Sequence, residues 1–535
     1  MRRTRGTSRP TLTLRLSRVA SGSALGRRVR ALRDELGMRR APLHWTSMFG
    51  VVAFACVVVL FVTGFLLLFG YTPSSTRVTY AGPYTPLAGA EMSKAFQSTL
   101  AISWEVPGGL LIRQAHHWAA LLLPAAIILQ LAVSFFTGAF RRPRRFAWLL
   151  LFGLLLTALL GGWSGYALPD DMLSGTGLRI VEGIVLGIPV IGTWMSALLF
   201  GGEFPGRIIE NLYPLHVALV PALLVVLLAG RAWSAAARKP AQFAGPGRSE
   251  DRIVGVPVWP NLAALAGGLL ALTTGGIVLI AATVTISPVW LYGPSSPGDA
   301  SAGSQPDWYT GFLDGALRLV PPGWEVVWLG RTWSLAIIVP LAVVGLFLLA
   351  IALYPFVEEW VTGDHRDHHV LDRPRNEPTR TGLGVASLVF YGALWGAGSA
   401  DLVATHFHVS VELVVAGYQM LVVLGPVTAF VLTRRVCLAL EKRDRDILLH
   451  GYETGRIVRL PGGEYAEVRG RVDAEQRYRL AGPAAAHPFE ARPRYDGRLR
   501  LSDRVRAASS AAFFEDRLEP VDVENSLATV GDSHG

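Results

Sequence analysis

The sequence is organised as long apolar runs separated by shorter stretches rich in charge, glycine or proline. Eight of these runs reach the roughly 20 residues that an α-helix needs to cross the hydrocarbon core of a bilayer. The predicted spans are residues 46–71, 112–137, 147–168, 212–233, 261–286, 333–355, 381–400 and 411–433. The pattern therefore predicts an all-α integral membrane protein with eight transmembrane helices.

Basic residues alternate between the segments that connect these runs. Residues 1–43 hold twelve arginines, and the link at 141–145 reads RRPRR. By contrast, the loops at 72–111, 168–207 and 287–332 hold two basic residues each. Because lysine and arginine accumulate on the cytoplasmic side of membrane proteins, the alternation predicts that both termini are cytoplasmic and that the chain lies in the plasma membrane.

Composition supports the membrane class and excludes others. Charged residues make up 17% of the chain, whereas about a quarter is usual for soluble proteins. The net charge of +10 is explained by cytoplasmic arginines that face an anionic leaflet, so no nucleic-acid partner is expected. The two cysteines, Cys56 and Cys437, form neither a disulfide framework nor a zinc site. No signal peptide is expected, and the basic N-terminal arm is expected to be partly disordered, with an amphipathic surface helix as the alternative.

Three histidines, His116, His117 and His216, are the only ones between Trp45 and Asp364. Two of them open apolar helices, His116 in HHWAALLLPAAIILQLAVSFF and His216 in HVALVPALLVVLLAGRAW. A polar side chain inside a bilayer is costly, so such histidines are candidates for function. Two histidines at matching depth could bind the two faces of one haem. The alternative is a pair of interfacial histidines that are hydrogen-bonded to backbone or headgroups.

Two of the predicted outer loops contain segments that are more apolar than ordinary linkers. The segment RIVEGIVLGIPVIGTWMSALLF predicts a pair of short surface helices, and WYTGFLDGALRLV predicts a further one. After the latter comes Pro322-Gly323-Trp324-Glu325, in which a carboxylate stands among apolar residues beside a membrane span. Taken alone, this fragment is best explained as an interfacial anchor, because tryptophan favours that depth.

The chain resembles the cytochrome b subunit of a quinol–cytochrome c reductase, in its long actinobacterial form. The phrases that carry the resemblance fall in the family's order over about residues 40 to 460: RQAHHWAALLLPAAIILQ, FFTGAFRRPR, GYALPDDMLSG, PVIGTW, FGGEFPG, SAGSQPDWY, P-x-W-E, YPFVE, TGDHRDHH and HGYETG. The resemblance implies a four-helix bundle of the first four spans that holds two b haems, each bound by one histidine from the second span and one from the fourth. It also implies quinol oxidation near the outer surface and quinone reduction near the inner one.

Only the outer haem has its expected ligands here, His116 and His216. Fourteen residues advance a helix by about 21 Å and return to nearly the same face, so a second pair of ligands is expected one such step inward. Gln130 and Arg231 stand at those positions, and arginine cannot give up its proton to bind iron. Two bis-histidine haems need four histidines, so the sequence predicts one haem b.

Other residues that the family associates with the haems follow the same division. The family places small glycines where the haem edges press against the first and third spans; Gly64 and Gly165 are present at the outer site. At the inner site Gly50 is present, but Leu151 replaces the other glycine. Arg113 suits a propionate of the outer haem.

The resemblance also assigns roles around the quinol. The family uses a Pro-Glu-Trp-Tyr element in the outer pocket, and the long form shows a Pro-x-Trp-Glu variant, which Pro322, Trp324 and Glu325 match. Glu325 is expected to accept a quinol proton, with His408 as its partner and Asp401 as a helper. For His408 alone, a solvated loop histidine is an equal alternative.

The prediction is therefore a subunit of a respiratory menaquinol–cytochrome c reductase, an oxidoreductase and translocase. The implied partners are a Rieske iron–sulfur protein, a cytochrome c subunit, a second copy of the chain and a terminal oxidase. The predicted regions are a basic arm at 1–43, a haem bundle at 44–235, a linker at 236–260, a C-terminal helical region with the quinol-site loop at 261–433 and a cytoplasmic tail at 434–535. The alternatives are a non-catalytic paralogue that acts as an assembly or regulatory scaffold, and an unrelated transporter, which the ordered motifs disfavour.

Overall fold

The computed structural model describes residues 23–517 except 203, 297, 300–304, 481–486 and 492–499. In this described part, eight helices are long and apolar enough to cross a membrane, which confirms the predicted number of spans and the all-α class. These helical segments are Trp45–Leu67, Gly109–Phe136, Arg145–Ala167, Ile208–Ala237, Val258–Thr283, Leu335–Thr362, Pro378–Gly398 and Val411–His450.

The last span differs most from its prediction. Helix α17 continues to His450, whereas the apolar run ends at residue 433. The added residues are rich in arginine and leucine, which are strong helix formers. The charged residues after position 433 therefore end the apolar run, but the helix continues through them.

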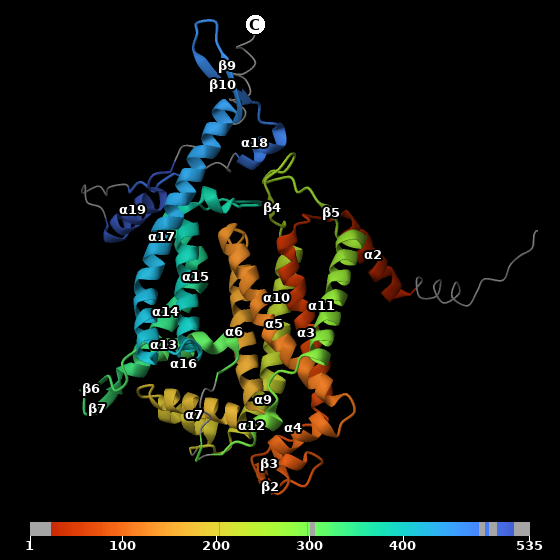
Figure 1. Cartoon of the computed structure of the whole chain (residues 1–535). Coiled ribbons are helices and arrows are strands. Elements are labelled where there is room, and N and C mark those ends of the chain that lie inside the picture. The colour runs from red at the N-terminus through yellow and green to blue at the C-terminus, as the bar shows by residue number, and fades with distance from the viewer. Residues whose placement is uncertain are drawn as a thin grey trace, which may run out of the picture.

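The spans form two groups that stand side by side (Figure 1). The first group comprises α3 (Met48–Leu67), α5 (Gly109–Phe136), α6 (Arg145–Ala167) and α10 (Val220–Ala237), with α11 (Ala263–Thr283) against α3 and α5. The second group comprises α14 (Leu335–Thr362), α15 (Pro378–Gly398) and α17 (Val411–His450). A buried apolar cluster runs through the first group, and α14 reaches α6 from the second.

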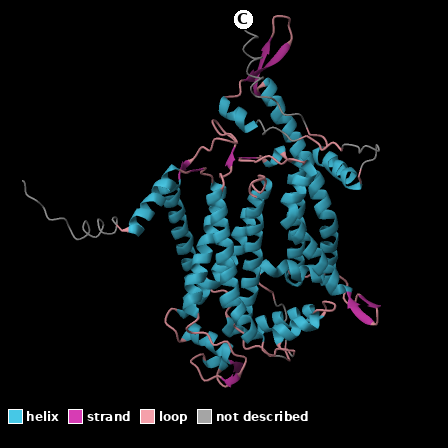
Figure 2. Cartoon of the chain, turned by 180° about the vertical axis from the view of Figure 1, so that it is seen from behind, coloured by secondary structure: helices cyan, strands magenta, loops and turns pink. Residues whose placement is uncertain are grey.

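The two ends of the bundle are built differently, as both views show (Figures 1 and 2). We call them the basic end, which carries the RRPRR link, and the loop-rich end. The basic end holds α2 (Ala24–Met38), α18 (Ala474–Leu480), α19 (Leu501–Phe514) and the strand pairs β1–β5 (Arg40–Ala41, Val256–Pro257), β4–β8 (Gln242–Phe243, Val370–Leu371) and β9–β10 (Tyr452–Arg459, Tyr465–Gly470). The loop-rich end holds α4 (Lys94–Trp104), α7 (Met172–Leu186), α8 (Gly192–Phe200), α9 (Ile208–Pro214), α12 (Val289–Tyr292), α13 (Gly311–Arg318), α16 (Ala400–Phe407) and the pairs β2–β3 (Arg77–Thr79, Glu91–Ser93) and β6–β7 (Glu325–Trp328, Arg331–Ser334).

The short helices confirm the secondary structure that was expected for two of the connecting loops. The segment expected to form two surface helices does so as α7 and α8, and the predicted helix before Pro322 is α13. In the N-terminal arm, the described residues from Ala24 to Met38 are helical, which favours the surface helix over disorder there. The arm's first 22 residues lie outside the described residues.

A buried charge cluster at the basic end joins the two helix groups. Arg380 of α15 is 0% exposed and donates to Glu358 of α14 at 3.0 Å and to Asp372. Arg141, in the link between α5 and α6, pairs with the same Asp372 at 2.7 Å. Burial alone would raise the pKa of Asp372, but Arg141 and Arg380 outweigh it and hold that pKa below its ordinary value. The cluster thus ties the first helix group to the second.

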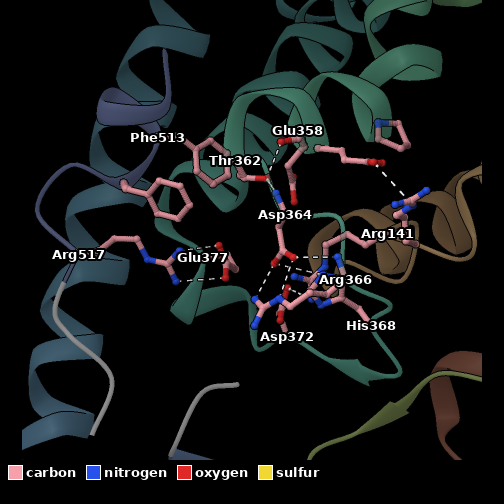
Figure 3. A pocket seen from close by; sticks show the side chains of 14 residues that line it. Arg141, Glu358, Thr362, Asp364, Arg366, His368, Asp372, Glu377, Phe513 and Arg517 are labelled. Carbon is pink, nitrogen blue, oxygen red and sulfur yellow. Dashed lines mark hydrogen bonds and ion pairs between the residues drawn. The ribbon is translucent and has the colours of Figure 1, made fainter. Parts of the chain in front are cut away.

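The C-terminal helix closes this cluster from the outside. Arg517, just after α19, donates to the carboxylate of Glu377 at 3.1 Å. Figure 3 shows this pair, together with Arg141, Glu358 and Asp372 of the cluster, around one small cavity whose volume is about 40 Å³. The tail beyond the last span is therefore folded back onto the helix bundle through α19.

Candidate functional site

Two histidines from different helices face each other inside the first helix group. His116 lies on α5, and His216 lies in a five-residue π-turn, Leu215–Leu219, between α9 and α10. Pro221, shortly after it, has no N–H to donate to the preceding turn, and wide turns of this kind are frequent at functional sites. The two ring centroids are 6.2 Å apart, and the ring planes are inclined by 65°. Two metal–imidazole bonds of about 2.0 Å each would place the centroids about 6 Å apart, so these two residues could hold one haem iron between them.

Hydroxyl groups on the neighbouring spans set the tautomer of both rings. The hydroxyl of Thr63 donates to the backbone carbonyl four residues earlier at 2.6 Å, and its oxygen lies 2.9 Å from Nδ1 of His116. Ser164 repeats the arrangement: its hydroxyl donates to the carbonyl of Leu160 at 2.7 Å, and its oxygen lies 3.1 Å from Nδ1 of His216. Since each hydroxyl hydrogen is already donated, each oxygen accepts from Nδ1–H. This network assigns the lone pair to Nε2, the nitrogen that can bind a metal.

The expected glycines form the walls behind the two rings. A Cβ on Gly64 would lie 3.2 Å from Cε1 of His116, and a Cβ on Gly165 would lie 2.6 Å from Cε1 of His216. Each glycine directly follows the hydroxyl residue of its span, Thr63 or Ser164. Each wall therefore combines a hydroxyl that orients the imidazole with a glycine that leaves it room.

A cavity of about 410 Å³ opens between these histidines and is lined by both glycines and by Arg113. Arg113 donates from Nη2 to the carbonyl of Ser287 at 3.1 Å, while its buried Nε has no hydrogen-bond partner among the residues that the structure describes. An arginine with a donor to spare suits a carboxylate such as a haem propionate. The residues present therefore fit the haem that the resemblance implies.

The same cavity is lined by a carboxylate that the sequence reasoning missed. Asp307 lies 3.2 Å from Nε2 of His117 and accepts a hydrogen bond of 2.8 Å from the hydroxyl of Tyr309, which also lines the cavity. Trp308 anchors this segment to α5 by donating to the carbonyl of Leu121 at 3.2 Å. The signal was present in the sequence: Pro306-Asp307-Trp308-Tyr309 differs from the pattern Pro-Glu-Trp-Tyr only in having aspartate in place of glutamate.

Glu325 and His408, the carboxylate and histidine that were expected to act on the quinol, lie outside this cavity. Glu325 begins β6, and Pro322, Trp324 and Glu325 are all exposed. His408 is also exposed, in a left-handed conformation (φ 55°) at the end of α16. Neither Glu325 nor His408 lines the cavity, and within the described residues no hydrogen bond or ion pair joins them. Asp401, the expected helper, instead pairs with Arg318 at 3.0 Å.

Two buried carboxylates stand beside the cavity at the loop-rich end. Asp170 and Asp171 follow α6, and burial raises the pKa of each to about 6. Asp171 also caps α7, because its side chain accepts from the backbone N–H of Ser174 at 2.8 Å. Both carboxyl groups consequently titrate closer to neutrality than ordinary aspartates.

The positions of the second haem are filled by side chains. A Cβ on Gly50 would lie 3.6 Å from the amide oxygen of Gln130, so this glycine faces Gln130 across the bundle and the fourteen-residue register holds. Arg231 donates to the carbonyl of Ala147 on α6 at 2.9 Å. Leu151 is buried in the apolar cluster of the first helix group. The region that would need two imidazoles and a glycine wall holds an amide, a guanidinium and a leucine.

Comparisons with known proteins agree with this geometry. Residues 121–294 match the family described as Cytochrome b(N-terminal)/b6/petB. The cytochrome bc1 complex cytochrome b subunit of Streptomyces coelicolor is 44% identical over 501 residues, which cover 92% of each chain. The chain belongs to the cytochrome b family of the bc1 complex. The corresponding subunit of Mycobacterium tuberculosis is 44% identical over 82% of this cytochrome b and 80% of its own length.

A solved structure supports the fold independently. A chain described as a hyperthermophilic respiratory Complex III superimposes with a TM-score of 0.58 at 18% identity, covering 79% of this cytochrome b and 98% of that chain. At that identity the likeness concerns the fold. The predicted family and fold class are thus confirmed, and the protein is a membrane subunit of respiratory electron transfer.

Proposed function

We propose that this cytochrome b oxidises a quinol at the loop-rich end, as a subunit of a menaquinol–cytochrome c reductase in the plasma membrane. The observation that carries the proposal is the facing pair His116 and His216, whose Nε2 atoms are available for a metal and whose rings have glycine behind them. A haem held by these two residues would accept and pass on single electrons. The choice of menaquinol, the Rieske and cytochrome c partners, the second copy of the chain and the terminal oxidase are parts of the proposal that rest on the family resemblance.

Asp307 is the carboxylate best placed to take a proton from the quinol. It lines the same cavity as the two histidines and occupies the glutamate position of the family's element. The hydroxyl of Tyr309 and the imidazole of His117 hold its two oxygens in place. A carboxylate fixed in this way can accept a proton from a hydroxyl group that is bound within hydrogen-bond reach. Glu325 with His408 remains the second candidate, and its exposed position makes it the weaker one.

We further propose that the protein holds one haem b. The support is the side-chain filling of the inner positions by Gln130, Arg231 and Leu151. The charge pattern supports a cytoplasmic location for the basic end and hence for both termini.

Haem content per polypeptide tests this proposal. The complex purified from membranes should contain one low-spin haem b per chain, reducible by a menaquinol analogue. Replacing His116 or His216 by alanine should remove it, whereas replacing His117 by glutamine should leave the haem content unchanged. Two bis-histidine haems per chain would overturn the single-haem proposal, and a haem that no quinol reduces would overturn quinol oxidation.

The lost inner ligands also favour a second hypothesis, in which the protein is a non-catalytic cytochrome b that serves as a scaffold. That hypothesis predicts an assembled complex with no quinol-driven turnover. The same measurement of haem reduction separates the two.

A further inference from the structure

A short hairpin at the loop-rich end exposes an apolar tip. Strands β6 and β7 pair from Glu325–Ser334 at the base to Trp328–Arg331 at the tip. Val327 and Leu329 are each 76% exposed, and Trp328 is 59% exposed. Residues 326–330 carry no charge. Large apolar side chains that gather on a protruding element point to a contact outside the chain itself.

The turn of this hairpin has an unusual residue. Leu329 and Gly330 both have positive φ, 52° and 69°, as a two-residue hairpin turn requires. Asparagine or aspartate would fit the first position with less steric cost than leucine. The tip therefore carries an apolar side chain where the backbone alone would favour a polar one.

The base of the hairpin is fixed at the boundary of a membrane span. Helix α14 begins at Leu335, directly after β7, and Ala336 in its first turn donates to the carbonyl of Trp324 at 3.1 Å. This helix has a mean hydropathy of 3.0 and is largely unburied within the chain. From that base the hairpin projects sideways from the bundle, as seen from both sides (Figures 1 and 2). A sideways projection at the end of a span runs along the bilayer surface.

Tryptophans of the hairpin suit the same environment. Trp324, Trp328 and Trp333 fall within ten residues, and tryptophan is enriched at the depth of lipid headgroups. Trp333 donates from its indole N–H to the carbonyl of Trp328 at 3.0 Å, and the two rings lie 5.6 Å apart. The indole donor is thereby satisfied within the hairpin, and the ring faces remain available to apolar surroundings.

We infer that the β6–β7 hairpin inserts its tip, Val327 to Leu329, into the interface of the bilayer leaflet at the loop-rich end. Lipid fits this surface better than a protein partner does, because a specific protein interface buries about 800 Å² on each side, more than a few tip residues offer. An amphipathic element needs no such minimum and sinks about 5–10 Å into the headgroup region. The hairpin anchors the connection between α13 and α14 to the membrane. This inference is independent of the proposed quinol chemistry.

Site-directed fluorescence in the purified complex, reconstituted in lipid nanodiscs, tests the insertion. Both native cysteines, Cys56 and Cys437, are buried, so the wild type serves as the labelling blank. A polarity-sensitive dye is attached at Val327→Cys or Leu329→Cys. The control is Leu460→Cys, at the turn of the β9–β10 hairpin, which extends beyond the basic end of the bundle (Figure 1).

The dye at 327 or 329 should be blue-shifted, should be quenched by lipids brominated near the headgroup, and should be several-fold less sensitive to aqueous iodide than the dye at 460. Equal iodide quenching at both hairpins would overturn the inference. Protection from iodide without quenching by brominated lipid would also overturn it, because a protein subunit would then cover the tip.

Discussion

Replacing Gly165 by alanine should damage the haem site more than the same replacement at Gly64. The Cβ added at Gly165 would lie 2.6 Å from Cε1 of His216, whereas ordinary contact begins at 3.4 Å, so the ring must move by 3.4 − 2.6 = 0.8 Å. That shift is a large fraction of a metal–imidazole bond of about 2.0 Å. Overpacking of this kind costs about 1–3 kcal/mol. If haem binding bears this cost, haem affinity falls roughly 5- to 150-fold.

Two other glycines provide a graded series. At Gly64 the Cβ would lie 3.2 Å from Cε1 of His116, which requires a shift of only 3.4 − 3.2 = 0.2 Å, so alanine there should have a small effect. At Gly267 on α11 nothing lies within 4 Å, so alanine should be neutral for haem. Haem content and the ratio of low-spin to high-spin ferric haem in the purified variants measure the series. Full low-spin haem in Gly165→Ala would refute the placement of His216 against this wall.

Two further predictions concern the carboxylate of the cavity and the charge cluster. Asp307→Asn keeps the shape but removes the base, so haem reduction by a quinol analogue should slow by about 10²- to 10⁴-fold with little change in quinol binding, while the exposed Glu325→Gln should react like the wild type. The reverse ranking in stopped-flow measurements would identify Glu325 as the acceptor. Arg380→Met removes the partner of buried Glu358, leaves Asp372 with Arg141 alone, and should lower the free energy of unfolding by about 3–5 kcal/mol. Arg366→Ala, which removes an exposed guanidinium from its pair with Asp364, should cost under about 1 kcal/mol. Similar unfolding midpoints for these two variants would contradict a stabilising role for the cluster.

Local and periodic features of this protein could be predicted from the amino-acid sequence alone. Eight apolar runs of sufficient length predicted eight helical spans, because an α-helix satisfies its backbone hydrogen bonds within the segment, as the bilayer core requires. The fourteen-residue step assigned Gln130 and Gly50 to the same inner site, and in the structure a Cβ on Gly50 would lie 3.6 Å from the amide oxygen of Gln130, because helix geometry is the same in every chain. The histidine count and the ordered motifs then singled out His116 and His216 without any coordinates.

Which loop residues reach the cavity depends on how the loops pack against the helices. Asp307 and His117 are 190 positions apart in the chain, and no periodicity links them. Two carboxylates, in Pro-Asp-Trp-Tyr and in Pro-Gly-Trp-Glu, resembled the family's elements, but packing against α5 brings Asp307 to the cavity and leaves Glu325 on a projecting hairpin. The tautomers of the two histidines could not be predicted from the sequence either, since they depend on hydroxyls more than fifty residues away along the chain. The geometry of a helix is set by local backbone hydrogen bonds, whereas the position of a loop depends on the surfaces against which it packs.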